Sequence, residues 1–322
     1  MQTIQVDAIN RIHIAGAGIM GASMAQIFAR HGYKVTVYDA FEKGVENGKK
    51  MMATNQETSV ASGDVTQAES DAICKNIVFT MDKSVFADAQ FVIEAIIERM
   101  DVKHAFWAET SAAAPKDAIL TTNTSGLSIT EIAKAVVLPE RFAGMHWINP
   151  PHIVPLVEVI SGAQTDAAVP DKIVELSRRV GKQPVTVKKD ASGFILNRIQ
   201  FCILREAMHI VESGIAEKED VDKVLKYGLG MRYACLGPFE IADIGGLDTF
   251  HSIASYLFAD LCNVKEPQAM LSELHKQGSF GVKAGKGFYD YPGDRAQQVI
   301  KKRDADFIKL ANTMYKGESN KK

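Results

Sequence analysis

The chain has 322 residues, of which 46% are hydrophobic and 24% are charged, and its formal net charge is −2. This length and composition predict a globular protein with two domains, and the balanced charge excludes a general attraction to nucleic acid or to an anionic membrane. The four cysteines lie far apart, so we expect no disulfide framework, and Cys202 and Cys235 are expected to be buried thiols. No secretory signal or membrane-spanning apolar run is visible, which favours a cytoplasmic protein.

The N-terminal part of the chain carries a nucleotide-binding pattern. A short β-rich run, R-I-H-I-A, is followed at the start of a helical pattern by G-A-G-I-M-G. In this G-x-G-x-x-G arrangement Gly16 permits a tight turn, Gly18 allows a pyrophosphate to approach the backbone, and Gly21 allows the helix to pack closely on the strand. Ile19 and Met20, which lie between the glycines, are expected at the cofactor as well.

An acidic residue completes this pattern. The second predicted strand, K-V-T-V-Y-D, ends at Asp39, 18 residues after Gly21. An acidic side chain at this position binds the adenosine ribose hydroxyls and repels a 2′-phosphate, so the sequence predicts NAD rather than NADP. The alternative, an ordinary strand–turn–helix with incidental glycines, is disfavoured by the completeness of the pattern.

Strands and helices alternate through the rest of the first half. Residues 41–80 read as helical and polar, and strands are predicted at 90–98 and 118–125 with a helix between them. The alternation predicts an α/β fold with a mostly parallel, doubly wound sheet of the Rossmann type. Ligands bind such sheets at the carboxyl ends of the strands, where Glu98, Asn123 and Ser125 emerge, although each of these could also be a capping or turn residue.

The second half of the chain changes from mixed to helical. Residues 161–188 predict one more helix and a strand, and Gly193 then breaks the pattern. We therefore expect a Rossmann-like NAD-binding domain over 1–189 and an all-helical domain over 190–322. Its helices are predicted over R-I-Q-F-C-I-L-R-E-A-M-H-I-V-E-S, over D-V-D-K-V-L-K-Y with a glycine stop, over about 247–263, and over an amphipathic segment near the end. The long apolar faces of such a domain also offer a surface for a homodimer.

One stretch, G-M-H-W-I-N-P-P-H-I-V-P-L-V-E-V-I, places a carboxylate among apolar residues. Glu158 needs a partner there, because an unpaired buried carboxylate is costly, and His146 and His152 are the two candidates. The spacing of these three residues matches no familiar zinc arrangement, so we expect no metal.

Eight motifs occur along the chain in the order of one known family. They are G-A-G-I-M-G, V-I-E-A-I-I-E, N-T-S-G-L-S-I-T, R-F-A-G-M-H-W-I-N-P, P-L-V-E-V-I, G-F-I-L-N-R, L-G-P-F-E and F-G-V-K-A-G-K-G-F-Y. With these motifs, the chain resembles the L-3-hydroxyacyl-CoA dehydrogenase family from Arg11 to about Tyr291. The resemblance implies NAD as cofactor, a Rossmann-like domain followed by a helical dimerisation domain, and oxidation of a hydroxyl group to a ketone.

The resemblance implies roles for four residues. His146 matches the catalytic base, which takes the hydroxyl proton while hydride leaves the same carbon for the nicotinamide. Glu158 matches the carboxylate that orients the imidazole and stabilises its charged form. Ser125 and Asn197 match residues that hydrogen-bond the reacting oxygen and position the substrate. A structural histidine is the alternative for His146, and the presence of all four residues together disfavours it.

The resemblance also implies further cofactor contacts. Asn149 matches a contact on the nicotinamide side, and Glu98, Lys103 and Lys283 match other cofactor positions. Asn123, at a predicted strand end, is expected at the cofactor with them.

The chain departs from the thioester-using relatives in three places. Pro155 stands where those relatives have a lysine. Residues 51–70, which match an arm that contacts CoA, contain no Lys or Arg, although phosphate recognition normally uses such cations. The segment Y-G-L-G-M-R-Y-A-C-L-G-P-F-E is longer than its counterpart and adds Arg232. Because an arginine fork pairs well with a carboxylate, Arg232 is our candidate for binding a substrate carboxylate, and a surface or dimer-contact arginine is the alternative.

These departures predict a small free hydroxy acid as the substrate. Branches of this kind include the λ-crystallin type L-gulonate 3-dehydrogenases and the 5-formyl-3-hydroxy-2-methylpyridine-4-carboxylate dehydrogenases. A short-chain L-3-hydroxyacyl-CoA such as 3-hydroxybutyryl-CoA is the main competitor, and a pyridine-carboxylate alcohol or aldehyde is a third possibility. A non-catalytic NAD-binding protein is disfavoured because Ser125, His146, Glu158 and Asn197 are all present.

Overall fold

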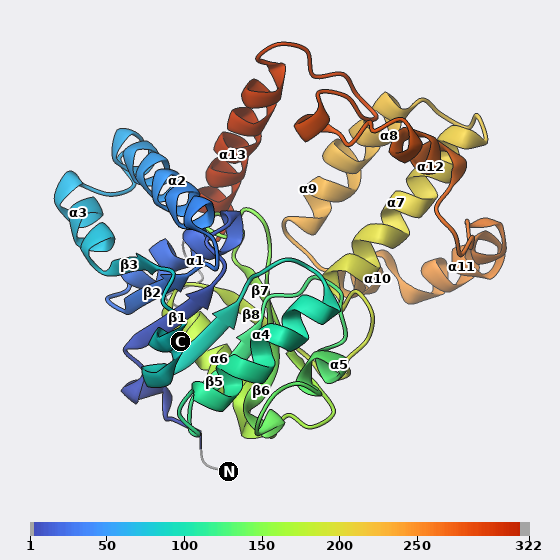
Figure 1. The fold of residues 1–322 in the computed structure, drawn as a ribbon. Coiled ribbons are helices and arrows are strands. Elements are labelled where there is room, and N and C mark those ends of the chain that lie inside the picture. The colour runs from blue at the N-terminus through green and yellow to red at the C-terminus, as the bar shows by residue number, and fades with distance from the viewer. Residues whose placement is uncertain (1–2, 316–322) are drawn as a thin grey trace. The chain divides into compact units, whose positions relative to one another are not determined.

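The computed structural model describes residues 3–315 of the chain. The chain forms two compact units that divide after Asn197. The first unit alternates strands and helices, and the second is helical (Figure 1). The division falls within helix α7 (Leu196–Glu212), somewhat C-terminal to the boundary at residue 189 that the glycine break predicted.

The first unit is built on one sheet of eight strands in the order β3-β2-β1-β4-β5-β6-β7-β8. Neighbouring strands are parallel everywhere except between β6 and β7, which are antiparallel. The predicted α/β fold with a mostly parallel sheet is therefore confirmed. The strands are β1 (Arg11–Ala15), β2 (Lys34–Tyr38), β3 (Ile77–Thr80), β4 (Phe91–Glu94), β5 (Ile119–Thr122), β6 (Phe142–Trp147), β7 (Leu156–Ser161) and β8 (Gln183–Val187).

Helices cover both faces of this sheet (Figure 1). They are α1 (Ile19–Arg30), α2 (Glu42–Ala61), α3 (Gln67–Lys75), α4 (Met100–Ala113), α5 (Ile129–Ala133) and α6 (Ala168–Arg179). Short 3-10 turns lie at η1 (Val6–Ala8), η2 (Lys83–Asp88) and η3 (Pro139–Arg141).

Strand β3 differs from the prediction, because residues 41–80 read as helix only. The run I-V-F-T, which forms β3, pairs in parallel with β2 at the edge of the sheet. Its residues are β-branched or aromatic and suit a strand. Four residues are too few, however, for a strand period to stand out beside two polar helices.

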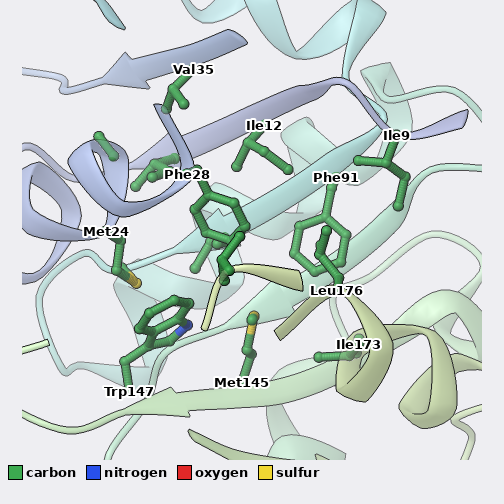
Figure 2. Close-up of a cluster of buried hydrophobic side chains, with 14 of the residues drawn as sticks. Ile9, Ile12, Met24, Phe28, Val35, Phe91, Met145, Trp147, Ile173 and Leu176 are labelled. Carbon is green, nitrogen blue, oxygen red and sulfur yellow. The ribbon is translucent and has the colours of Figure 1, made fainter. Parts of the chain in front are cut away.

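Two apolar cores lie on the two faces of the sheet. On one face α1 and α6 contribute Phe28 and Leu176 to a core that also contains Trp147 of β6, whose ring lies next to that of Phe28 (Figure 2). On the other face α4 and α5 contribute Trp107 and Ile132. Each large apolar side chain that is buried in this way contributes about 1.5–3 kcal/mol, so the strands are held firmly between their helices.

Successive side chains of a strand point to opposite faces of the sheet, and this alternation fixes the direction of two polar side chains. In β6, Met145 and Trp147 point into the core under α1 and α6, so His146 between them points to the α4 and α5 side. In β7 the residues on both sides of Glu158 do the same. His146 and Glu158 therefore point to one face of the sheet, and both are buried.

The second unit is helical. It contains most of α7, then α8 (Lys218–Val224), a π-helical turn η4 (Leu225–Leu229), α9 (Gly230–Tyr233), α10 (Pro238–Gly245), α11 (Leu247–Asp260), α12 (Ala269–Lys276), the 3-10 turn η5 (Val282–Ala284) and α13 (Arg295–Met314). No helix in residues 3–315 has both the length and the apolar character that crossing a membrane requires.

The helix that begins at Lys218 does not stop at the glycines as predicted. It passes through the π turn and continues as α9. A Cβ atom on Gly230 would lie 2.7 Å from the carbonyl oxygen of Leu225, so glycine allows the wider turn to close. A glycine at this position predicts a helix end, whereas in the structure the π turn absorbs an additional residue within the helix.

The second unit leaves many large apolar side chains uncovered. Phe239 is 86% exposed, Tyr227 77% and Phe258 73%. Cys202 and Cys235 are exposed as well, so the prediction of buried thiols is wrong. Cys202 lies on α7 beside the exposed Phe201, and Cys235 lies in the turn after α9 beside the half-buried Leu236, so apolar neighbours in the sequence do not bury either thiol.

Candidate functional site

The turn between β1 and α1 depends on two glycines. Gly16 has a φ of +102°, and a Cβ atom there would lie 2.5 Å from the carbonyl oxygen of Ala95. A Cβ atom on Gly21 would lie 1.8 Å from the carbonyl oxygen of Gly16. Both positions therefore need glycine for the fold itself, as the sequence pattern predicts.

Gly18 differs from its two neighbours in the pattern. A Cβ atom on Gly18 would meet no protein atom within 4 Å, so packing within the protein does not require glycine there. Gly18 is exposed and is the N-cap residue of α1, where N–H groups are available to an anion. A dinucleotide whose pyrophosphate contacts this backbone would account for the glycine, and the turn therefore fits NAD.

Asp39 lies at the carboxyl end of β2 beside this turn. Its Oδ2 accepts a hydrogen bond from the Ala17 N–H at 2.9 Å, and its Oδ1 accepts one from the Phe41 N–H at 3.0 Å. The carboxylate is thus fixed against the glycine turn, and its remaining lone pairs suit the ribose hydroxyls of NAD. Ile19 and Met20 occupy the first turn of α1, next to Gly18.

His146 and Glu158 are direct partners across the antiparallel strands β6 and β7. The His146 Nδ1 and the Glu158 Oε2 lie 2.8 Å apart. Because an ionised carboxylate only accepts hydrogen bonds, Nδ1 carries the proton and Nε2 of the neutral ring is left with a free lone pair. The pair can therefore accept a proton at Nε2, and Glu158 then compensates the positive charge.

The second oxygen of Glu158 binds the start of α7. Its Oε1 accepts the N–H groups of Ile195 at 2.9 Å and Leu196 at 3.0 Å. Burial raises the pKa of the Glu158 carboxyl, but the hydrogen bonds from His146, Leu196 and Ile195 together outweigh it, and the pKa lies below its usual value. Glu158 is therefore ionised throughout the neutral pH range.

Ser125 and Asn197 are also brought together. The Asn197 Nδ2 donates to the carbonyl oxygen of Ser125 at 2.8 Å. The Ser125 N–H donates to the Glu98 Oε1 at 2.9 Å, and the Thr124 hydroxyl donates to the same oxygen at 2.5 Å. Burial raises the pKa of Glu98. The hydrogen bonds from Thr124 and Ser125 and the charge of Lys103 lower this pKa by more than burial raises it, so the carboxyl also stays ionised.

Glu94 was missed by the sequence reasoning. It is fully buried at the end of β4, and its carboxylate accepts the Lys103 ammonium at 2.5 Å, the Thr122 hydroxyl at 2.7 Å and the Trp107 indole N–H at 3.3 Å. Lys103 also lies 3.3 Å from Glu98 and is only 1% exposed. The signal was present, because a carboxylate in V-I-E-A raises the same question as the one in L-V-E-V.

The loop between β6 and β7 (residues 148–155) carries Asn149 and His152, both of which are exposed. Lys182, which the sequence did not single out, immediately precedes β8 and binds this loop. Its Nζ donates to the carbonyl oxygens of Pro151 at 2.5 Å and Val154 at 2.9 Å, and it lies 5.2 Å from the centre of the Trp147 ring. Burial lowers the pKa of Lys182 to about 8.

The remaining predicted residues lie in different places. The side-chain oxygen of Asn123 accepts the Trp147 N–H at 2.7 Å, which ties the carboxyl ends of β5 and β6 together. Arg232, on α9, and Lys283, on η5, belong to the second unit, and both are exposed. Within residues 3–315, no group of three or more His, Cys, Asp and Glu side chains could hold a metal ion.

Two family domains match the chain in succession. Residues 11–191 match 3-hydroxyacyl-CoA dehydrogenase, NAD binding domain, and residues 193–291 match 3-hydroxyacyl-CoA dehydrogenase, C-terminal domain. The chain belongs to the 3-hydroxyacyl-CoA dehydrogenase family. As a member of this family it is an NAD-dependent oxidoreductase that acts on CH–OH groups.

Relatives of two kinds lie within this family. A 5-formyl-3-hydroxy-2-methylpyridine 4-carboxylate 5-dehydrogenase from Mesorhizobium japonicum is 35% identical over 92% of this chain and 95% of its own length. A 3-hydroxybutyryl-CoA dehydrogenase from Mycobacterium tuberculosis is 37% identical over 88% of this chain and 99% of its own length.

Solved structures of both kinds are also similar to this chain. The structure of a 5-formyl-3-hydroxy-2-methylpyridine 4-carboxylic acid 5-dehydrogenase, an NAD+-dependent dismutase, has a TM-score of 0.89 and 33% identity, and the match covers 96% of this chain and 99% of the other. The (S)-3-hydroxybutyryl-CoA dehydrogenase from Ralstonia eutropha has a TM-score of 0.74 and 31% identity, with 89% and 100% covered.

Proposed function

We propose that this dehydrogenase oxidises the secondary hydroxyl group of a small free hydroxy acid, with His146 as the base. The observation that carries the proposal is the buried His146–Glu158 pair. The hydrogen bond of 2.8 Å between Nδ1 and the Glu158 Oε2 places the ring proton on Nδ1, which leaves a free lone pair on Nε2. General bases of this kind typically accelerate a reaction by about 10²- to 10⁴-fold.

His146 receives the proton of the substrate hydroxyl at Nε2. Bound NAD+ supplies the acceptor for the hydride that leaves the same carbon. Glu158 stabilises the imidazolium that forms, because its carboxylate is held by His146 and by the two N–H groups of α7. We assign the Ser125 hydroxyl and the remaining N–H of Asn197 to the reacting oxygen, where hydrogen-bond donors stabilise developing charge.

Glu98 and Lys103 have an indirect part in this proposal. Lys103 is almost fully buried between Glu94 and Glu98, and Glu98 binds the backbone of Ser125. Together they fix the loop that follows β5. This loop carries Asn123 and Ser125, and it lies at the edge of the sheet where we propose that NAD binds. Asn149 and Lys283 remain proposed cofactor contacts on the evidence of their sequence motifs.

A free acid is favoured over a CoA thioester by the charges on the chain. The second half of α2 and the start of α3, residues 51–70, carry no Lys or Arg for the CoA phosphates. Arg30, which could reach this arm, is engaged with Asp64 at 2.7 Å. On α9 the exposed Arg232 follows the π turn, and an arginine fork suits a substrate carboxylate.

A pyridine-carboxylate alcohol or aldehyde is a second candidate. It is supported by the TM-score of 0.89 with the solved pyridine-carboxylate dehydrogenase, against 0.74 for the hydroxybutyryl-CoA enzyme. Both candidate substrates carry a free carboxylate, so Arg232 has the same proposed role in each.

NADH formation, followed by absorbance, tests the proposal with three substrate classes: small 3-hydroxy acids, hydroxymethyl or formyl pyridine carboxylates, and short-chain L-3-hydroxyacyl-CoAs. We expect kcat/KM to be higher for a free acid than for every thioester, by about tenfold or more, which corresponds to one well-placed charged hydrogen bond. A preference for a thioester would assign the enzyme to acyl-CoA metabolism. Binding of NAD with no turnover in any class would favour a non-catalytic protein.

Arg232→Ala tests the carboxylate contact separately. Loss of a charge-assisted hydrogen bond should raise KM for the free acid about 10- to 100-fold and leave KM for NAD unchanged. Arg295→Ala, which removes another exposed arginine of the second unit, is the matched control and should change neither value. Equal values of KM for wild type and Arg232→Ala would contradict the carboxylate contact and would favour the alternative, that Arg232 is a surface or dimer-contact residue.

We also propose that the enzyme is a homodimer joined through the second unit. The second unit leaves many large apolar side chains exposed, including Tyr227, Phe239 and Phe258, and extensive exposed apolar surface typically marks a site of protein association. A second copy of the chain would cover them.

A further inference from the structure

A strained residue lies beside the acid–base pair. Gly193 and Phe194 both have left-handed backbones, with φ angles of 75° and 52°. Glycine adopts this conformation freely, whereas a bulky residue does so rarely, and Phe194 shares a positive φ with only one other non-glycine residue in the described part of the chain, Leu138. Such strain persists only where surrounding contacts hold it, and it gathers at functional sites.

The ring of Phe194 contacts the catalytic histidine. It is 2% exposed and belongs to the core on the α4 and α5 side of the sheet. Its centre lies 5.6 Å from the centre of the His146 imidazole, at an angle of 59° between the planes. One side of the imidazole is therefore bounded by a fixed aromatic ring.

The backbone that follows Phe194 reaches the other half of the pair. The next two N–H groups, of Ile195 and Leu196, both donate to the Glu158 Oε1, and Asn197 then donates to Ser125. The chain reverses at Gly193 and Phe194 just before these contacts. The direction of the two N–H groups is thus set by the left-handed turn.

The segment is also fixed on its N-terminal side. The Asp190 Oδ2 accepts the Ser128 hydroxyl at 2.6 Å and the Thr130 N–H at 2.8 Å, at the start of α5. With both flanks held, Phe194 cannot relax to an ordinary backbone conformation without withdrawing the N–H groups from Glu158.

We propose that Phe194 is a positioning residue, whose left-handed turn directs two backbone N–H groups onto Glu158 and whose ring fixes the plane of the His146 imidazole. This inference rests on the proposed function, because it takes His146 as the base. Phe194 acts through the pair and needs no contact with substrate or cofactor.

Phe194→Ala and Phe194→Gly separate the turn from the ring. Both variants remove the ring, but only glycine adopts the left-handed conformation without strain. We expect Phe194→Ala to lower kcat by about 30-fold or more, since small displacements of catalytic groups cost up to about 100-fold, and Phe194→Gly to recover at least about threefold of that loss. The Kd for NAD should not change in either variant.

Leu138 supplies the matched control, because its φ is 59° and it precedes η3 at the amino end of β6, the end opposite to His146. Leu138→Gly relieves the same kind of strain, and Leu138→Ala keeps it. Both should retain kcat within about twofold of wild type, since neither displaces a catalytic group. A loss of kcat in Leu138→Ala equal to that in Phe194→Ala would show that the effect is general destabilisation.

A double-mutant cycle with Glu158→Gln tests whether Phe194 acts through the pair. If it does, Phe194→Ala should lower kcat by less than about threefold in the Glu158→Gln background, because the two effects are then not additive. A purely structural loss would lower kcat by the same factor in both backgrounds. Phe194→Leu, which keeps most of the buried apolar volume, repeats the cycle should Phe194→Ala not fold.

His146→Gln distinguishes the two proposals. Wild-type turnover in His146→Gln would overturn the proposed function itself. An inactive His146→Gln together with wild-type kcat in both Phe194→Ala and Phe194→Leu, or with additive losses in the cycle, would overturn only the positioning role of Phe194.

Discussion

At the scale of single residues, two fully buried carboxylates organise the first unit, and their partners decide what each can do. Glu94 forms a fully buried ion pair with the ammonium group of Lys103 and also accepts hydrogen bonds from Thr122 and Trp107. Glu158 is paired with the imidazole of His146, whose second ring nitrogen has a free lone pair that can accept a proton. Glu94 therefore holds structure together, whereas Glu158 can support proton transfer.

Glu158→Gln should lower kcat by about 10²- to 10⁴-fold, the range typical of a lost acid–base contribution. The carboxylate accepts three donors, from His146, Ile195 and Leu196, whereas a carboxamide has one acceptor oxygen and places an NH2 group against a donor. Steady-state kinetics at saturating NAD measure the change, and the Kd for NAD should stay the same. An unchanged kcat would exclude a role for Glu158 in stabilising the imidazolium.

The residues of the site were predictable to different degrees from the sequence. His146, Glu158, Ser125 and Asn197 lie in distinctive motifs, and a carboxylate in an apolar run signals a partner. The antiparallel pairing of β6 with β7, which makes His146 and Glu158 direct neighbours, was not predicted, because the proline-rich loop between them hides the strand ends. The run V-I-E-A signals that Glu94 needs a partner, but it does not identify Lys103, Trp107 and Thr122 as its partners, because they lie 9 to 28 residues further along the chain.

At the scale of elements, the loop between β6 and β7 is fixed by one buried lysine. Lys182 follows a glycine at the end of α6 in G-K-Q-P, a context that reads as an exposed turn, so its burial could not be predicted. Its ammonium group binds two loop carbonyls and has the Trp147 ring beside it, with no carboxylate among these contacts. The loop that carries Asn149 is therefore held by a cation in a poorly solvated place.

Stability should depend on pH through Lys182. Its pKa is about 8 in the folded state, against an ordinary 10.5, so between these values the unfolded chain binds more protons and the free energy of unfolding rises with pH. The gain from pH 8 to 10.5 should approach about 3 kcal/mol, at about 1.4 kcal/mol per pKa unit. Below about pH 8 Lys182 is charged in the folded protein, so the full free-energy cost of burying its charge lowers the stability.

Urea unfolding of wild type and Lys182→Met at pH 7 and at pH 10 measures this contribution. Lys182→Met also leaves the carbonyls of Pro151 and Val154 without their donor, which adds a constant loss at both pH values. We expect the stability of wild type relative to Lys182→Met to increase from pH 7 to pH 10. Parallel curves for the two proteins would contradict an effect of Lys182 on the pH dependence.

At the scale of the whole molecule, the two units differ in how they bury apolar surface. The first unit has two cores, one on each face of its sheet, whereas in the second unit, within the described residues, only a few side chains such as Met208 and Ile241 are buried. A unit with so small a core of its own depends on further contacts for stability. This is the physical basis for the proposed homodimer.

Sedimentation equilibrium should give a mass of about 70 kDa, twice the 35.2 kDa of one chain, down to nanomolar concentrations if the interface is large and apolar. The chemical reactivity of the Cys202 and Cys235 thiols, which are exposed on the second unit of the single chain, provides a second measure of whether this surface is covered in the dimer. A mass of one chain at micromolar concentration would contradict the homodimer.

The role of His146 as the base is tested by the rate of NADH formation in a single turnover, measured by stopped flow for wild type and His146→Gln with the preferred free hydroxy acid. We expect His146→Gln to lower this rate by about 10²-fold or more while the Kd for NAD stays within about twofold, because the proposed cofactor residues after β1 and β2 are unchanged. A wild-type rate of NADH formation in His146→Gln would contradict this role of His146.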